Sequence, residues 1–269
     1  MGAGQMENFG QMENFAKSFV VPLLAKRRWT RVCEIGARLG GITELLAMFP
    51  SIALTVIDPC LDCDLKEKFA GNPHVTVKKG ISLKVLPELH NDFDCILIDG
   101  DHNWYTVYHE LKVISDRDLL KRGGIVFLHD VEWPWGRRDM YYQPEMIPSE
   151  YRHSWEQKGV VRGRRELTDR GGFCPAYCKA TCEGGARNGV LTAIEDFLRE
   201  HKDEYKFFRV RGDFGLGIMY HRKNFREDLK FLTVECQGVA YNVFTWPKRF
   251  TKVHFPSAFS LAKSLFGRA

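Results

Sequence analysis

The sequence predicts an α/β protein built around a doubly wound, mostly parallel sheet. Short apolar runs typical of strands alternate with helix-like segments between residues 31 and 129. The run at 93–99 is apolar almost without interruption, as expected of a parallel strand buried on both faces. Polar residues follow several of these runs, so parallel strands would gather them at one edge of the sheet.

Each expected element has its own local signal. Apolar residues at helical spacing from Phe15 to Leu24 predict a short amphipathic helix before the sheet. The strands are expected at 31–36, 54–58, 74–78, 93–99 and 125–129, with a final antiparallel pair near 205–210 and 215–220. The helices are expected at 42–49, 104–114 and 190–198. Gly123 and Gly124 are expected to end the helix that begins at 104, as glycines commonly do.

Three parts are expected along the chain. Residues 1–29 form an N-terminal helical arm, residues 30–221 the main domain, and residues 222–269 an extension rich in basic and aromatic residues. Within the main domain, residues 131–186 are irregular and rich in Trp, Tyr, Pro, Arg and Gly, which is typical of a functional lid. The same aromatic residues would also suit a contact between subunits.

The composition favours a folded protein without membrane spans. The chain has 269 residues, 44% of them hydrophobic, which is enough to bury a full core. No run approaches the roughly 18 apolar residues that a membrane span needs, and the first residues lack the pattern of a signal peptide. We therefore expect a cytoplasmic protein.

The eight cysteines are accordingly expected to be reduced thiols. Cys174, Cys178 and Cys182 repeat every fourth residue, which on a helix would align three sulfur atoms. Pro175 and the lack of a fourth ligand at a familiar spacing count against a metal site there.

The net charge of +5 comes from the C-terminal extension, which holds 9 Lys or Arg against 3 Asp or Glu. The remaining residues carry 30 basic and 31 acidic groups, so the main domain does not favour a nucleic-acid partner. The extension would instead serve docking, self-association or contact with an anionic surface.

The ends of four strands should share one crevice near the point where the strand order reverses. They carry Glu34 to Gly36, Asp58, Asp99 to His102, and His129 with Asp130. The loop after the first strand is glycine-rich but lacks both the dinucleotide and the P-loop pattern, because Arg38 replaces a glycine and no Gly-Lys-Ser/Thr follows. A nucleoside without phosphates fits better, and Asp58 can accept hydrogen bonds from both ribose hydroxyls.

These motifs together resemble a known family. Glu-Ile-Gly-x-x-x-Gly-x-x-Thr from Glu34, Ile-Asp-Pro around Asp58, Asp-Gly-Asp-His at 99–102 and His-Asp at 129–130 look like the class I S-adenosylmethionine-dependent methyltransferases. More narrowly, they resemble the branch with the macrocin-type sugar O-methyltransferases. The resemblance implies a seven-stranded sheet with an antiparallel last strand and a lid insertion after the fifth strand.

The resemblance also implies which residues bind S-adenosylmethionine. The residues expected at the cofactor are Glu34, Gly36, Ala37, Arg38, Gly40, Gly41, Thr43, Asp58, Gly80, Ser82, Asp99, Gly100, Asp101 and His102. Ile81 stands where the family often has an acidic residue. An alternative role for Asp101 is to cap the helix that follows it.

Methyl transfer to an alcohol needs a base, and a histidine suits this role near neutral pH. We expect His102 to be that base, with Asp99, Asp130 and His129 completing the catalytic group. The resemblance implies that Asp99 and Asp130 hold a divalent metal such as Mg²⁺, although the usual further ligand beside Asp130 is replaced by His129 or Val131. Glu132 or Asp101 could compensate. His129 could equally be a buried imidazole that orients Asp130.

The acceptor is expected to be a small molecule or glycan, with a sugar favoured, bound by an enzyme that forms homo-oligomers. Aromatic rings and directional donors on the lid suit a sugar or another planar acceptor. The residues expected to bind it are Trp133, Trp135, Arg137, Arg138, Tyr141, Tyr142, Arg152 and His153. Two alternatives are a nucleic-acid methyltransferase that uses the basic extension and a non-catalytic binding protein on the same fold.

Overall fold

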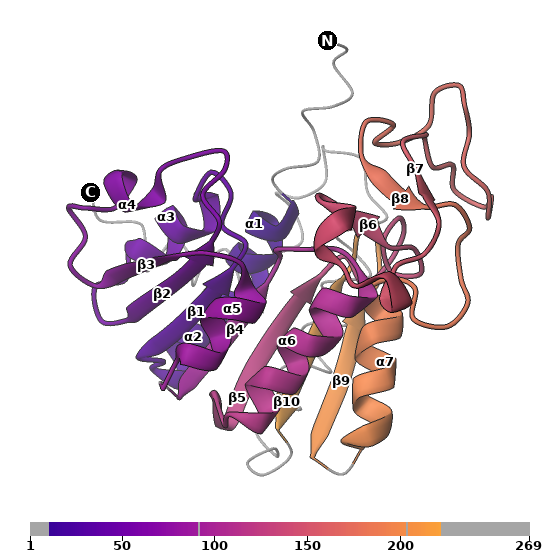
Figure 1. Cartoon of the computed structure of the whole chain (residues 1–269). Coiled ribbons are helices and arrows are strands. Elements are labelled where there is room, and N and C mark those ends of the chain that lie inside the picture. Colours follow the sequence, from indigo (N-terminus) through magenta and orange to yellow (C-terminus); the bar gives the residue numbers. More distant parts are fainter. Residues whose placement is uncertain (1–10, 91, 203, 222–269) are drawn as a thin grey trace, which may run out of the picture.

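A computed structural model describes residues 11–90, 92–202 and 204–221 of the chain. Seven strands form the main sheet in the order β3-β2-β1-β4-β5-β10-β9 (Figure 1). They are β1 (Arg31–Ile35), β2 (Ala53–Asp58), β3 (Val75–Lys79), β4 (Phe93–Ile98), β5 (Leu120–His129), β9 (Tyr205–Val210) and β10 (Leu216–His221). All neighbours are parallel except β10, which is antiparallel to β5 and β9. The predicted sheet is confirmed.

The sheet has a helical layer on each face. One layer holds α1 (Gln11–Phe15), a π-helical turn (Ala16–Val20), α2 (Val21–Arg27), α3 (Gly41–Ala47) and α4 (Leu65–Lys68). The other holds α5 (Ser82–Val85), a 3-10 turn (Leu86–Glu88), α6 (Trp104–Asp116) and α7 (Val190–Glu200). Successive residues of each strand point to opposite layers, so Val32 joins the first core and Cys33 the second.

The register of the central strands brings their carboxyl ends level with one another. Ile35 at the end of β1 pairs with Ile57 of β2 and with Ile98 of β4. The order of strands reverses between β1 and β4, since the chain first builds outward through β2 and β3 and then returns. The residues after these three strands therefore meet at one edge of the sheet.

The predicted role of Gly123 and Gly124 is wrong. Helix α6 already ends at Asp116, and the N–H of Leu119 donates to the carbonyl of Ile114 (3.0 Å) just beyond it. The two glycines lie inside β5, at an irregularity where the pairing of β5 with β4 shifts register. Gly123 has a φ of +80° there, and such a backbone angle suits a bulge better than regular strand.

The segment expected to be a lid builds a second, three-stranded sheet above the carboxyl ends of β4 and β5 (Figure 1). Its strands are β6 (Met140–Tyr141), β7 (Trp155–Glu156) and β8 (Cys178–Ala180), with 3-10 turns at Pro144–Met146 and Ser149–Tyr151. We call residues 131–186 the insertion.

The three regularly spaced cysteines belong to this insertion. Cys178 lies in β8, and Cys174 and Cys182 flank the strand, so they do not share a helix face. The C-terminal extension and residues 1–10 of the N-terminal arm lie outside the described residues. Within the described ranges, no helix is both long and apolar enough to cross a membrane.

Candidate active site

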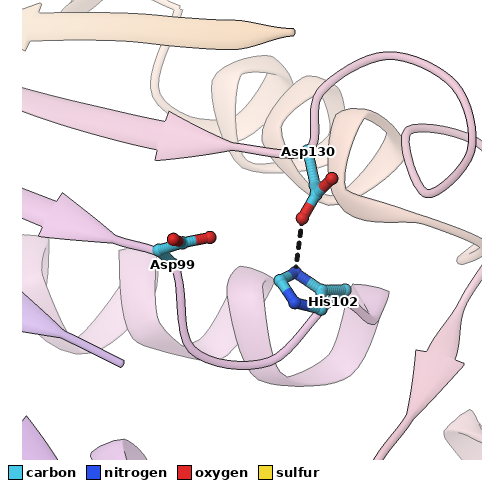
Figure 2. A group of neighbouring side chains, drawn as sticks. All are labelled: Asp99, His102 and Asp130. Atoms are coloured by element: carbon cyan, nitrogen blue, oxygen red, sulfur yellow. Dashed lines mark ion pairs between the residues drawn. The ribbon is translucent and has the colours of Figure 1, made fainter. Parts of the chain in front are cut away.

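Three side chains expected in the catalytic group come together at the edge of the sheet. Asp99 follows β4, His102 lies in the loop before α6, and Asp130 follows β5 (Figure 2). Each offers one ligand atom, and these atoms all lie within 4.8 Å of one another. Among the described residues, no other group of three or more His, Cys, Asp or Glu meets this criterion.

Hydrogen bonds connect this cluster to His129. His102 donates from Nδ1 to Oδ2 of Asp130 (2.9 Å), shown as the dashed line in Figure 2. His129 directs its Nδ1 at Oδ1 of Asp99 (2.8 Å) and at Oδ2 of Asp130 (3.2 Å). A carboxylate accepts only, so both rings carry a proton on Nδ1. His129 therefore bridges the two aspartates, and Oδ2 of Asp130 accepts hydrogen bonds from both imidazoles.

Burial and charge shift the protonation of this group. Burial opposes ionisation of Asp130, but the neighbouring charges and hydrogen bonds of His129 and His102 hold its pKa well below the usual range. Burial alone would lower the pKa of His102, yet the charge and hydrogen bond of Asp130 raise it above the ordinary value. Against the same effect of burial, Asp130 and Asp99 raise the pKa of His129 well above its ordinary value.

The free side of His102 faces a hydroxyl group. Its Nε2 lies 3.2 Å from the hydroxyl of Tyr142, which is half exposed at the rim of the insertion. With Nδ1 protonated toward Asp130, Nε2 is the ring atom that can accept a proton. The structure thus places an oriented imidazole ring opposite an O–H group.

The loop that carries His102 is fixed at several points. Asn103 caps α6 by accepting from the N–H of Thr106 (2.9 Å). Asp101 accepts from the hydroxyl of Thr106 (2.8 Å) and from the N–H of His102 (3.2 Å). The carbonyl of His102 accepts from the N–H of Met140 in β6 (3.0 Å). Asp101 therefore serves the start of the helix, and the insertion contacts the backbone of His102 directly.

The loop after β1 is held by Asp58. Its Oδ2 accepts from the N–H groups of Ala37 (2.9 Å) and Arg38 (2.8 Å), and its Oδ1 accepts from the N–H of Cys60 (2.5 Å). The side chain expected to bind ribose is thus engaged with the glycine-rich loop. Any contact of Asp58 with a nucleoside would use the remaining lone pairs of this carboxylate.

Close backbone packing explains the glycine at the end of β1. Gly36 has a φ of +84°, and a Cβ there would lie 2.3 Å from Cα of Gly100. The loops after β1 and β4 therefore touch at these two glycines. Gly40 and Gly41 begin α3, while Gly80 and Ser82 flank the start of α5. All the residues expected at the cofactor lie at or near the ends of β1 to β4.

One buried oxygen in this region lacks a partner. Glu34 at the end of β1 uses Oε2 to accept from the hydroxyl of Thr43 (2.6 Å), but Oε1 is buried without a hydrogen bond. Burial raises the pKa of Glu34 to about 8, although the hydrogen bond from Thr43 opposes the shift. An unpaired buried oxygen is costly, and a bound cation such as an ammonium group would relieve that cost.

Most of the residues expected to bind the acceptor have other partners. Arg137 forms an ion pair with Glu195 of α7 (2.6 Å), and the guanidinium of Arg138 is buried against backbone carbonyls of the insertion. Arg152 donates to the carbonyl of Pro144, and the ring of His153 bonds the carbonyl of Arg187.

Three of the four aromatic residues expected to bind the acceptor also have other partners or are buried. Trp133 lies under the guanidinium of Arg162, Trp135 is buried in the insertion, and Tyr141 donates to Asp139. Tyr142 alone among the eight contacts the histidine of the cluster, through the 3.2 Å approach to His102.

The structure adds residues that the sequence did not single out. Phe214, which precedes β10, stacks on the ring of His129 (5.8 Å between centroids), and Phe15 of α1 meets the same ring edge-on (6.0 Å). Asp139 lies in the irregular insertion and accepts the N–H of Trp104 at the start of α6. Phe15 belongs to the amphipathic pattern of the arm, but nothing in the sequence around Asp139 marks it.

One protein-family model matches the segment of the chain that carries these motifs. Residues 33–131 match the model of a family described as a methyltransferase domain. No curated protein matches the sequence.

Several solved structures are similar to the chain. The SAH-bound methyltransferase PaMTH1 of Podospora anserina is 15% identical (77% of this chain, 78% of that chain, TM-score 0.46). The O-methyltransferase TomG of Streptomyces achromogenes with SAM is 14% identical (76% and 78%, TM-score 0.45). The O-methyltransferase of Bacillus cereus with SAH is 13% identical (77% and 81%, TM-score 0.45).

Proposed function

We propose that this chain, in which residues 33–131 form a class I S-adenosylmethionine-dependent methyltransferase domain, transfers a methyl group to a hydroxyl of a small molecule. The observation that carries the proposal is the geometry of His102. Asp130 orients its ring through Nδ1, while Nε2 faces a hydroxyl group at 3.2 Å. This arrangement suits the removal of a proton from an alcohol.

The reaction needs a base at the moment of transfer. When bound, S-adenosylmethionine supplies a methyl group on a positively charged sulfur. An acceptor hydroxyl in the place now taken by the Tyr142 hydroxyl would give its proton to Nε2 of His102 as its oxygen forms the new bond to the methyl carbon. On transfer, the sulfur would keep the electron pair of the carbon–sulfur bond. Asp130 remains ionised and stabilises the imidazolium that forms.

The residues around β1 fit the cofactor. The unpartnered Oε1 of Glu34 suits the ammonium group of the methionine part, and Glu34 lies at the end of β1, just before the glycine-rich loop. Gly36, Gly40 and Gly41 add no side chains to that loop, which lets it pack closely against Gly100, Phe69 and Glu13. Asp58 acts here mainly by holding the N–H groups of Ala37 and Arg38 in place.

Asp99 and Asp130 fit a divalent cation through carboxylate oxygens, and Oδ1 of Asp130 is buried without a partner. A bound cation would lower the pKa of the acceptor hydroxyl. Metal dependence is therefore part of the proposal, and removal of the metal by a chelator tests it separately: full activity after chelation would contradict it.

The finer identity of the acceptor rests on the resemblance to macrocin-type sugar enzymes. A sugar-like acceptor stays a prediction, since the four cationic or imidazole side chains expected to bind it have partners within the protein. A homo-oligomer likewise stays a prediction.

Measurements on the wild type and on one variant test the proposed function. Calorimetry should show binding of S-adenosylhomocysteine to the wild type, and no binding at high micromolar concentration would contradict the cofactor assignment. His102→Ala should lower turnover at least about 100-fold because the base is lost, with the affinity for S-adenosylhomocysteine nearly unchanged. His74→Ala is the matched control, since that ring bonds the carbonyl of Ala47 away from the site. Equal loss of turnover and affinity in His102→Ala would remove His102 as the base.

A further inference from the structure

Asp139 of the insertion joins two helices at their first residues. It is fully buried, and its Oδ1 accepts from the N–H of Trp104, which begins α6, and from the N–H of Gly189, which precedes α7 (2.7 Å each). Its Oδ2 accepts from the hydroxyl of Tyr141 (2.8 Å). One carboxylate therefore accepts from N–H groups at the starts of both helices, which have no partner within the helix. The helix dipoles also favour a negative charge at this position.

The approach of Gly189 is unusually close. This glycine has a φ of +91°, and a Cβ there would lie 2.5 Å from the backbone nitrogen of Arg138. In the other direction, the N–H of Asp139 donates to the side chain of Asn188 (2.7 Å). The start of the insertion and the start of α7 are thus locked together by Asp139 from both its backbone and its side chain.

The residues after Asp139 contact the base itself. The N–H of Met140 donates to the carbonyl of His102 (3.0 Å), and the hydroxyl of Tyr142 lies 3.2 Å from Nε2 of His102. Asp139 contacts Trp104, only two residues beyond His102. Asp139, Met140 and Tyr142 therefore hold the loop 102–104 together. They contact the N–H of Trp104, the carbonyl of His102 and the ring of His102, in that order.

We propose that Asp139 is a positioning residue for the reaction: it docks the insertion onto the start of α6 and thereby sets where His102 stands relative to Asp130 and the acceptor. This inference rests on the proposed function of His102. Asn103 caps α6 from within its own loop, so the helix would survive loss of Asp139. What would be lost is the fixed position of the insertion against that loop.

The test compares three variants of the full chain. Asp139→Asn keeps one oxygen for the two N–H groups, and Asp139→Ala removes it. Glu195→Gln is the control, because it removes the exposed ion pair of Arg137 with α7, which does not reach His102. Turnover is measured with the hydroxyl compound that gives the highest wild-type rate in a panel of phenols, monosaccharides and nucleosides.

Asp139→Ala should lower kcat about 100-fold, since a misplacement of about 1 Å can have that effect, while the KM for S-adenosylmethionine stays within about twofold of the wild type. Asp139→Asn should restore most of kcat, and Glu195→Gln should match the wild type. Hydrogen exchange of the backbone at 104 and 189 should accelerate in Asp139→Ala alone, a readout that needs no acceptor.

Three results would overturn the inference: unchanged kcat in Asp139→Ala, equal loss in the Asn and Ala variants, or loss through the KM for S-adenosylmethionine. If Asp139→Ala does not fold, Asp139→Ser replaces it, because serine is too short for both N–H groups but keeps a polar atom in the buried site. Failure of the wild type to bind S-adenosylhomocysteine would instead contradict the proposed function, and the exchange data would still report on Asp139.

Discussion

At the scale of single residues, the cluster depends on Asp130. This residue has a left-handed backbone (φ +62°), which directs its buried carboxylate back toward His102 and His129. Non-glycine residues adopt such angles infrequently, and aspartate is among those that tolerate them best. The chain accepts this strain at the point where two imidazoles share one oxygen.

The pH dependence of the reaction follows from the same pair. As the proposed base, His102 would act only when Nε2 is unprotonated, and Asp130 raises the pKa of His102 above its ordinary value. We expect kcat/KM to rise with pH through a pKa above about 6.5, the ordinary value for histidine. In Asp130→Asn the negative charge is gone, so the acidic limb should move to lower pH while turnover falls about 100-fold or more. A full pH–rate profile of both proteins checks this, and an unmoved limb would exclude Asp130 as the partner of His102.

The site was predictable from the sequence where residues follow strands directly. Asp99, His102 and Asp130 were expected in one crevice because parallel strands align their carboxyl ends, and the structure brings them within one cluster. Asp139 was not predictable, since its partners at Trp104 and Gly189 lie about 35 and 50 residues away in sequence. The residues expected at the cofactor lie at the predicted edge of the sheet, where β1 to β4 end. Their roles stay predictions.

At the scale of elements, the insertion is built around two buried cations. Lys179 of β8 is fully buried, and its Nζ donates to the carbonyls of Lys158, Cys174 and Tyr177. Burial lowers the pKa of Lys179 to about 8. Arg138 is also buried and donates to the carbonyls of Ala180 and Arg165. These two buried cations bind backbone carbonyls of the insertion beside its two small apolar clusters.

Loss of Lys179 should unfold the insertion and spare the main sheet. Lys179→Met fits the space but leaves three carbonyls without their donor, at about 1–3 kcal/mol for each buried group. We expect limited proteolysis to cut the variant within residues 156–177 while the affinity for S-adenosylhomocysteine changes less than about threefold. Lys158→Met is the control, because the ammonium of that lysine pairs with carboxylates at the surface. Equal protease resistance of the two variants would show that the cation is dispensable.

The secondary structure was predictable in the main sheet and not in the insertion. Buried parallel strands leave apolar runs such as 93–98 in the sequence, so their positions follow from composition alone. The strands of the insertion are two or three residues long, and β6 pairs with β8 across a long separation, Met140 opposite Lys179. Such short strands leave no period that could be recognised. The error at Gly123 has a similar origin, because a glycine in a strand irregularity resembles one that ends a helix.

At the scale of the whole molecule, buried acids make stability depend on pH. Glu110 of α6 is fully buried, and burial raises its pKa to about 8. Unfolding exposes it and returns the pKa to about 4.3. Between these values the folded state holds a proton that the unfolded state has lost, so stability falls as pH rises from about 4.3 to 8.

Glu110→Gln should remove this part of the pH dependence. The variant keeps the shape and stays neutral, so its free energy of unfolding relative to the wild type should increase by about 2–4 kcal/mol between pH 5 and pH 8. Urea denaturation at both pH values measures the difference. Glu88→Gln is the control, because that side chain is exposed and should give the same difference at both values. A constant difference for Glu110→Gln would mean that this carboxyl is ionised in the folded protein.

The lock at Asp139 also has a consequence for how the molecule can be rebuilt. Asp139 lies near the start of the insertion and Asn188 just after its end, and these two residues are joined by a hydrogen bond of 2.7 Å. Everything between them forms a cassette whose two ends meet. A short linker could replace it, or a different segment could be grafted there, without stretching β5 or α7. Such an exchange would alter the surface proposed to face the acceptor. The loop after β1, which is proposed to bind the cofactor, would keep its hydrogen bonds to Asp58.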